Sequence, residues 1–432
     1  MKFYLRYCCA MCFALISFLL APPQRAQAQT REAYVAQSAD TTTLTFYYDA
    51  LRSTRTGTTW GIEETKKKGD DTFPAWAETS LVEGDYATLR VVFDASFRDF
   101  RPTTTAKWFH CCGELKQIEG LEYLNTSEVK DMSSMFFACE SLTSLDLKNF
   151  NTKNVTDMSS MFAYCESLTS LDLKNFNTQN VTDMSRMFYD CGTLTSLDLK
   201  NFNTQNVTNM GEMFCSTSLT SLDLKNFNTQ NVTNMYGMFA TCMALTSLDL
   251  KNFNTQNVTN MGEMFCECES LTSLDLKNFN TNNVTDMVGM FYDCAALTSL
   301  DLKNFNTQNV TDMRGMFSDC TSLTSLDLKN FNTKKVTDMG WMFSDCTSLT
   351  LLDLKNFNTK NVTDMGGMFS GCAALTTINS NTAWQCSRSK DMFAGCTQLK
   401  GAVSYDENKV DATMANPETG YFTAESTTVR SR

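Results

Sequence analysis

The chain has 432 residues and a formal net charge of −12, from 36 Lys and Arg against 48 Asp and Glu. Because an acidic chain repels polyanions, this charge argues against nucleic acid and anionic membranes as partners and favours cationic or neutral ligands. The single histidine, His110, leaves no residue set for a His-based catalytic triad, and the sequence has no G-x-S-x-G motif. We therefore predict that the chain is not an enzyme and uses no cofactor or metal.

The first 28 residues are typical of a secretion signal. Lys2 and Arg6 give a basic start, residues 8–21 are apolar, and residues 26–28 (AQA) match an A-x-A cleavage site. The apolar run is too short to anchor a mature protein in a bilayer. Its removal takes away three basic residues and lowers the formal charge from −12 to −15. We expect the mature chain to be secreted or held at the cell surface.

Both ends of the chain outside the repeats are predicted to be β-rich caps. Residues 29–91 form the N-terminal module, in which residues 41–48 (TTTLTFYY) are rich in the β-branched and aromatic residues that favour a strand. Residues 402–432 form the C-terminal cap and tail, with candidate strands at 402–405 and 420–423. A repeat array needs such ends because an uncovered terminal unit exposes apolar surface and unpaired strand edges.

Between these ends, residues 92–401 consist of about 12 units of 25–27 residues. A fixed period in this range is typical of arrays in which each unit buries its apolar face only against its neighbours. The octet LDLKNFNT is identical in nine of the units, which start at Leu145, Leu171, Leu197, Leu222, Leu248, Leu274, Leu300, Leu326 and Leu352.

Each unit is interpreted as one short strand, one turn and one short helix. Residues 168–173 (LTSLDL) have the L-x-x-L-x-L spacing of a leucine-rich repeat, with the last leucines inward and Asp172 and Lys174 outward. Apolar residues within 155–165 recur at helical spacings. We therefore predict a leucine-rich-repeat solenoid, an α/β repeat with a parallel sheet on one face and short helices or helical turns on the other.

The consensus LTSLDLKNFNTQNVTDMxxMFxxCxxL closely resembles the repeat of the BspA-like leucine-rich repeat surface proteins, and the match covers roughly residues 92–401. This resemblance implies a secreted or surface protein of a host-associated bacterium. It also implies a role in adhesion to host matrix proteins or in co-aggregation with other cells. It does not indicate a particular ligand.

One cysteine recurs at the same position in most units, so that stacking would align these residues in a ladder. Many cysteines in a secreted protein normally indicate disulfides, but adjacent ladder side chains should point in parallel, away from bridging geometry. We interpret them as buried thiols that act as small hydrophobic residues, and regard Cys386 with Cys396 as the pair to test for a bridge. The predicted ladder comprises Cys139, Cys165, Cys191, Cys242, Cys268, Cys294, Cys320, Cys346 and Cys372.

The first candidate contact surface is the charged face of the predicted sheet. Asp146, Lys148, Asp172 and Lys174, with their copies, place an acidic row beside a basic row. Such a face could be a repetitive ligand-binding surface. We interpret it first as a solvated, self-neutralising surface that also prevents aggregation. Cation binding by the Asp row is a further alternative, but no extra carboxylate completes a calcium-loop spacing.

The second candidate surface lies where the copies differ. The two residues that follow the first methionine of M-x-x-M-F vary among units and include Tyr236, Arg314 and Trp341. These residue types are frequent at interface hot spots. Drift on an unused surface would also explain the variation.

We predict a secreted or cell-surface binding protein, adhesin-like, that contacts host extracellular matrix proteins, host cell-surface proteins or other bacterial cells. Many weak contacts along a regular face would add through multivalency. The alternative is a structural spacer or surface-layer component without a dedicated ligand. No membrane insertion is expected after signal removal.

Overall fold

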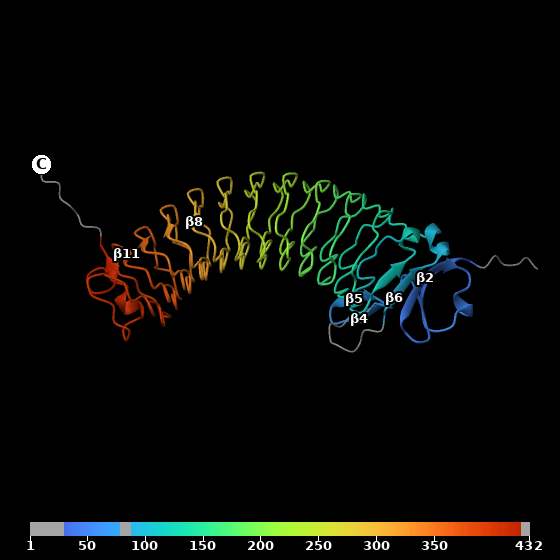
Figure 1. Cartoon of the computed structure of the whole chain (residues 1–432), viewed down its shortest axis with the longest axis horizontal. Coiled ribbons are helices and arrows are strands. Elements are labelled where there is room, and N and C mark those ends of the chain that lie inside the picture. Colours follow the sequence, from blue (N-terminus) through green and yellow to red (C-terminus); the bar gives the residue numbers. More distant parts are fainter. Residues whose placement is uncertain (1–29, 78–87, 425–432) are drawn as a thin grey trace, which may run out of the picture.

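The computed structural model describes residues 30–77 and 88–424, and the predicted secretion signal lies outside these residues. The described chain is an arch of stacked coils with a β-rich cap at either end (Figure 1). The domain boundaries proposed at 91/92 and 401/402 stay a prediction. Strand β6 (Arg90–Phe93) spans the first of them and belongs to the N-terminal sheet.

The N-terminal cap is a five-stranded sheet in the order β3-β1-β2-β6-β7. β1 pairs antiparallel with β2 and β3, whereas β2 pairs parallel with β6 and β6 parallel with β7. The sheet thus changes from antiparallel to parallel where the coils begin. Its elements, with the separate β4–β5 hairpin, are β1 (Glu32–Gln37), β2 (Thr43–Asp49), η1 (Arg52–Thr54), β3 (Thr59–Gly61), β4 (Thr65–Lys68), β5 (Asp71–Pro74), β6, η2 (Ala95–Asp99), β7 (Gln117–Glu119) and η3 (Leu121–Tyr123).

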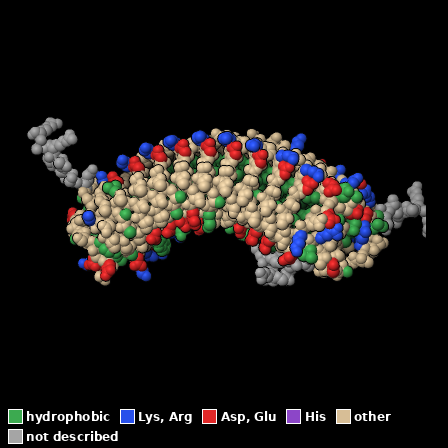
Figure 2. All heavy atoms as spheres, viewed as in Figure 1, with side chains coloured by type: hydrophobic (Ala, Val, Ile, Leu, Met, Phe, Trp, Pro, Cys, Tyr) green, Lys and Arg blue, Asp and Glu red, His purple; other side chains and the backbone are tan. Residues whose placement is uncertain are grey.

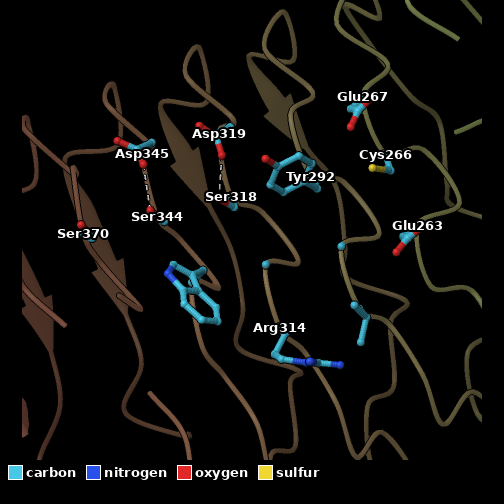
Figure 3. Close-up of a pocket in the computed structure, with 14 residues that line it drawn as sticks. Glu263, Cys266, Glu267, Tyr292, Arg314, Ser318, Asp319, Ser344, Asp345 and Ser370 are labelled. Carbon is cyan, nitrogen blue, oxygen red and sulfur yellow. Dashed lines mark hydrogen bonds between the residues drawn. The ribbon is translucent and has the colours of Figure 1, made fainter. Parts of the chain in front are cut away.

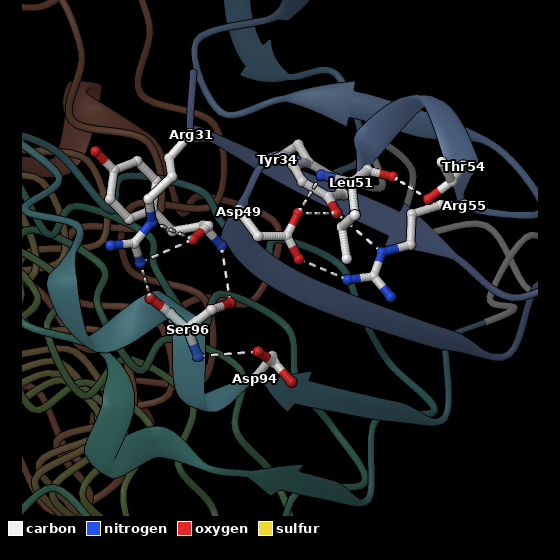
Figure 4. A network of polar contacts seen from close by, with 9 residues as sticks. Arg31, Tyr34, Asp49, Leu51, Thr54, Arg55, Asp94 and Ser96 are labelled. Atoms are coloured by element: carbon white, nitrogen blue, oxygen red, sulfur yellow. Dashed lines mark hydrogen bonds and ion pairs between the residues drawn. The ribbon is translucent and has the colours of Figure 1, made fainter. Parts of the chain in front are cut away.

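A polar network ties β1, β2 and the loop after η1 together in this cap (Figure 4). The Tyr34 hydroxyl donates to Asp49 Oδ1 at 2.8 Å and accepts from Arg55 Nε at 2.9 Å, and Arg55 also forms an ion pair with Asp49 at 2.6 Å. Burial raises the pKa of Tyr34 to about 12, so the phenol stays protonated and keeps donating at any physiological pH. The loop after η1 is thereby tied to both β1 and β2.

The C-terminal cap closes the stack through a short parallel sheet in the order β10-β11-β12. Trp384 packs edge-on against Phe422, with ring centroids 4.8 Å apart, and Tyr421 packs edge-on against Phe393 at 5.3 Å. Both aromatic residues cover the last coil. The remaining elements are β8 (Ser299–Leu300), β9 (Ser325–Leu326), β10 (Leu351–Asp353), β11 (Thr377–Asn379), η4 (Ala412–Met414) and β12 (Phe422–Thr423).

The segment predicted to be helical in each unit is not a helix. Backbone N–H groups of Met158, Ser160, Phe162 and Tyr164 donate to carbonyls of the next coil. The N–H groups of Met161 and Ala163, which lie between them, donate to the carbonyl three residues back and close four-residue β-turns. Ser160 and Tyr164 have φ of 54° and 59°, in the left-handed region, which interrupts a right-handed helix. In the described residues, the helices are four short 3-10 helices, and none of them lies in the segment of the unit that was predicted to be helical: η1 and η4 are in the caps, and η2 and η3 follow the strands of the first two, divergent units. The helical half of the predicted α/β repeat is therefore wrong.

The continuous parallel ladder also lies elsewhere than predicted. An unbroken series of parallel bridges runs from Thr104 through Asp131 and Asp157 to Arg388, in the T-D-M part of every coil. At the L-D-L positions, where the sheet was expected, the described chain has assigned strands in the first two, divergent units (β6 and β7) and in the last coils (β8 to β11), but none in the coils between them. Pairing between coils therefore occurs mainly on the side that was assigned to helices.

The core is one column of equivalent side chains. Phenylalanines of successive coils, from Phe136 to Phe393, stack with ring centroids 5.5–5.9 Å apart and planes within 11° of parallel. Val155, Met158 and Met161 are fully buried beside them, as are their counterparts in neighbouring coils. Each coil thus buries its apolar face against its neighbours, as the period indicates.

Buried threonines add a second ladder. The Thr152 hydroxyl donates to the carbonyl of Asn177 in the next coil at 2.9 Å and accepts from the Asn177 N–H at 2.7 Å. The hydroxyl therefore replaces a backbone peptide group in a bridge between coils. The same double contact recurs in every identical copy up to Thr333 and Asn358.

Candidate ligand-binding groove

The arch has two chemically different long faces (Figure 2). Ring spacing between neighbouring coils is 6.4 Å for Phe150 and Phe176, on the L-D-L-K side, but 5.7 Å for Phe136 and Phe162, on the M-x-x-M-F side. The wider spacing marks the L-D-L-K side as the convex rim and the other side as the inner face. Rows of Lys and Asp follow the convex rim, whereas acidic and hydrophobic side chains share the inner face.

A groove of about 890 Å³ runs along the inner face across five successive coils (Figure 3). It is formed by the residues that flank the Met-Phe pair of each coil, the positions at which the copies differ. We call it the acidic groove, and its lining residues are Glu263, Cys266, Glu267, Val288, Gly289, Tyr292, Arg314, Gly315, Ser318, Asp319, Trp341, Ser344, Asp345 and Ser370.

Four successive coils place a carboxylate immediately before the ladder cysteine. Glu267, Asp293, Asp319 and Asp345 all have φ between 50° and 60°, a left-handed conformation that Asp adopts more readily than most residues. The Ser318 hydroxyl donates to Asp319, and the Ser344 hydroxyl donates to Asp345, both at 2.8 Å. These hydrogen bonds fix the two carboxylates along the wall of the groove (Figure 3).

The carboxylates act on one another electrostatically. Partial burial raises the pKa of Asp293, and the negative charges of Glu269, Asp319 and Glu267 raise it further. The phenol pKa of Tyr292 is raised by burial and by Asp319 and Asp293. In the described part of the chain, none of the four carboxylates of the row forms an ion pair with Lys or Arg. The groove therefore carries uncompensated negative charge.

Two aromatic side chains are exposed within this negative field. Trp341 is 54 % exposed and Tyr292 is 37 % exposed. The indole of Trp341 lies against Gly367 of the next coil, where an added Cβ would be 2.6 Å from the indole Cδ1. Glycine at this position therefore leaves room for the indole beside the neighbouring coil.

The three ligand-contact residues predicted from the variation among copies do not all lie in the same groove. Arg314 and Trp341 line the acidic groove, but Tyr236 is half-buried outside it and contacts the coil of Gly262. Arg314 pairs with Asp312 at 3.0 Å and lies 3.7 Å from Asp338, so its guanidinium neutralises the bridge-ladder aspartates.

The Asp–Lys rows lie on the opposite face, along the convex rim. Asp146 pairs with Lys148 at 2.6 Å and Asp172 with Lys174 at 2.5 Å, and all four side chains are exposed. Corresponding pairs recur in each identical copy at 3.4–3.8 Å. The rim is self-neutralising within each coil.

Sequence reasoning missed the acidic row and Tyr292. The comparison of copies considered the two residues after the first methionine of M-x-x-M-F, and it did not consider the two residues before the ladder cysteine. The signal was present, since four successive copies carry Glu or Asp at the residue before the ladder cysteine.

The ladder cysteines are buried thiols that are not joined in disulfides in the described structure. Cys165 Sγ donates to the Phe136 carbonyl of the preceding coil at 3.2 Å, and burial raises the thiol pKa well above its ordinary value. The 25-residue coil places Thr217 at the ladder position, where it contacts Cys242 Sγ at 3.4 Å. The pair proposed for a bridge is unbridged, as Cys386 and Cys396 donate to different carbonyls.

Off the ladder, Cys266 forms part of the groove wall. Burial, then Glu267 and Glu263, raise its pKa to about 12. Among the described residues, no group of three or more His, Cys, Asp or Glu side chains could hold a metal ion. Over the same residues, no helix has the length and apolarity to cross a membrane.

A family model described as "Mycoplasma protein of unknown function, DUF285" matches residues 103–221, 183–301 and 290–406. No match was found among curated proteins. Similar solved structures include a leucine rich cell surface protein from Faecalibacterium prausnitzii, which is 19 % identical in sequence. The match covers 81 % of this chain and 93 % of the F. prausnitzii chain, with a TM-score of 0.42. Another is a T. pallidum leucine rich repeat protein, with 17 % identity, 63 % and 91 % covered, and a TM-score of 0.23.

Proposed function

This chain belongs to the family described as Mycoplasma protein of unknown function, DUF285, and we propose that it is an extracellular protein-binding array, adhesin-like, whose binding surface is the acidic groove. Its partners in this proposal are host matrix proteins, host cell-surface proteins or other bacterial cells. The features of residues 1–28 and the BspA-like repeat consensus support export and adhesion.

One observation carries the proposal. In an array of nearly identical coils, exposed aromatic residues and fixed carboxylates gather in one groove that spans five coils. Trp and Tyr are the residue types that dominate binding energy at protein interfaces. The convex rim, in contrast, repeats the same neutralised pair in each identical copy and offers nothing that distinguishes one coil from the next.

The test is binding of the purified mature chain, residues 29–432, to immobilised matrix proteins and to whole cells. The chain itself supplies substitutions that the fold accepts: the next coil has Ser318 where Tyr292 stands, and the neighbouring coils have glycine where Trp341 stands. We expect the double variant Tyr292→Ser, Trp341→Gly to lose at least tenfold in affinity.

Tyr189→Ser is the matched control, because Tyr189 occupies the position equivalent to Tyr292 but lies in a coil outside the groove. It should bind like the parent. Equal loss in the control and the double variant would reject the groove as the binding surface. Removal of one 26-residue unit from residues 145–196 shortens the array outside the groove. If the parent binds no partner and the shortened chain retains biological function, the spacer alternative replaces the proposal.

A further inference from the structure

The acidic groove and the convex rim differ in how their carboxylates are compensated. On the rim, every Asp of the identical octets has its own Lys within 3.8 Å, two residues further along the chain. In the groove, over the described residues, the Glu267 to Asp345 row has no Lys or Arg partner. The one guanidinium that lines the groove, Arg314, is already paired with Asp312.

The carboxylates of the Glu267 to Asp345 row follow one another at the spacing between coils, which is about 4.8 Å for backbones paired in a sheet. Like charges held this close repel, and the raised pKa of Asp293 reflects that repulsion together with burial. A cation bound between the walls would relieve it. Since the structure supplies no such cation from its own described side chains, charge complementarity favours a partner that brings several.

The aromatic residues define what kind of cation fits. Trp341 presents more than half of its surface, and its indole is supported from behind by Gly367. Asp319 and Asp345 stand in the same groove, each fixed by a serine hydroxyl. An ammonium or guanidinium group placed on an indole face gains from the ring quadrupole while carboxylates neutralise its charge.

We propose that the acidic groove binds an extended, lysine- or arginine-rich segment of a partner protein, with a cationic side chain on the indole of Trp341 and others against Glu267, Asp319 and Asp345, the members of the row that line the groove. The proposal rests on the proposed function and specifies the chemistry of the partner. Five coils span roughly 20 Å, which corresponds to about six residues of extended chain. Binding should weaken as salt is raised, because the walls are open to solvent.

The probe is a twelve-residue Lys-Gly repeat peptide, compared with Glu-Gly and Ser-Gly peptides of equal length. Binding to the full mature chain is followed by calorimetry and by acrylamide quenching of tryptophan. Trp341 is the exposed tryptophan among the described residues, since Trp76, Trp108 and Trp384 are buried and Trp60 is partly buried. We expect binding of the Lys-Gly peptide alone, with protection of Trp341 from the quencher.

Paired variants separate groove binding from attraction by net charge. Asp319→Asn with Asp345→Asn should weaken peptide binding at least tenfold, and asparagine also accepts the left-handed backbone there. Asp198→Asn with Asp223→Asn removes the same charge from the convex rim and should change affinity less than twofold. Trp341→Gly should remove the quenching signal and weaken binding about two- to fivefold.

Equal weakening by the groove and rim variants would mean attraction by net charge only and would overturn the inference. So would equal binding of the Ser-Gly or Glu-Gly peptide. If matrix binding depends on Tyr292 and Trp341 but the Lys-Gly peptide does not bind, the inference fails and the proposed function stands. If the peptide binds in the groove but no matrix protein or cell does, the adhesin-like role fails and the cation specificity stands.

Discussion

The threonine ladder gives a direct test of how the coils are held together. Thr255 is fully buried, and its hydroxyl donates to the Asn280 carbonyl at 3.0 Å and accepts from the Asn280 N–H at 2.7 Å. Replacement by valine keeps the shape but leaves both peptide groups of Asn280 without this partner. An unsatisfied, partly buried group costs about 1 kcal/mol at the low end, so Thr255→Val should lower the free energy of unfolding by about 2–3 kcal/mol.

Thr255→Ser is the control, because it keeps the hydroxyl and deletes one buried methyl group. That deletion should cost about 1 kcal/mol. Urea unfolding followed by circular dichroism measures both values, and hydrogen exchange of peptides around Thr255 and Asn280 reports whether the loss is local to this coil interface. A valine variant as stable as the parent, or more stable than the serine variant, would refute the view that the hydroxyl replaces a peptide group between coils.

Three further outcomes follow from the groove. Gly367→Ala should shift the fluorescence emission of Trp341 and lower the free energy of unfolding by about 1–2 kcal/mol. Gly315→Ala is the control, because Gly315 also has a positive φ but an added Cβ there would be 3.8 Å from its nearest neighbour. This variant should show the backbone cost without the emission shift. Asp293→Asn should raise the free energy of unfolding by about 0.5 kcal/mol or less at pH 7, after allowance for solvent screening. Because the folded-state pKa of Asp293 is raised, urea titrations at lower pH should show this gain vanish below the unfolded pKa of Asp. A gain that persists in acid would contradict this reasoning. Burial and the neighbouring carboxylates raise the pKa of Cys266 to about 12. At pH 8, peptide mapping should therefore find that a thiol reagent modifies Cys266 roughly a thousandfold more slowly than an ordinary thiol. Rapid labelling in the native protein would show that this wall of the groove is open.

The period and the buried residues could be predicted from the sequence. Identical octets at a fixed spacing require equivalent environments, and the structure buries Val155, Met158, Phe162 and Cys165 together in each coil. The local conformation could not be predicted from the same spacing. Successive β-turns return side chains to one face at nearly the same intervals as an α-helix, so periodicity alone does not separate the two.

The signal that separates them is the residue type between the apolar positions. Gly237, Gly289, Gly315 and Gly367 occupy the position of Ser160 in other copies, and all of them have positive φ. Glycine at such a fixed position favours a left-handed backbone over a helix interior. The groove was only partly predictable for a related reason. Its position depends on which variable residues fall on adjacent coils of the inner face, and that requires the turn geometry.

The contacts between coils also bear on how the length of such a chain can change over generations. Each internal coil makes the same backbone, threonine and phenylalanine contacts with both neighbours, and the caps pack on the first and last coils. Recombination between near-identical gene segments would therefore insert or delete whole 26-residue units without altering any type of contact. Gains or losses before Glu263 would carry the groove closer to or farther from the N-terminal cap while its own walls stayed intact. Reach and recognition can thus be inherited as separate traits.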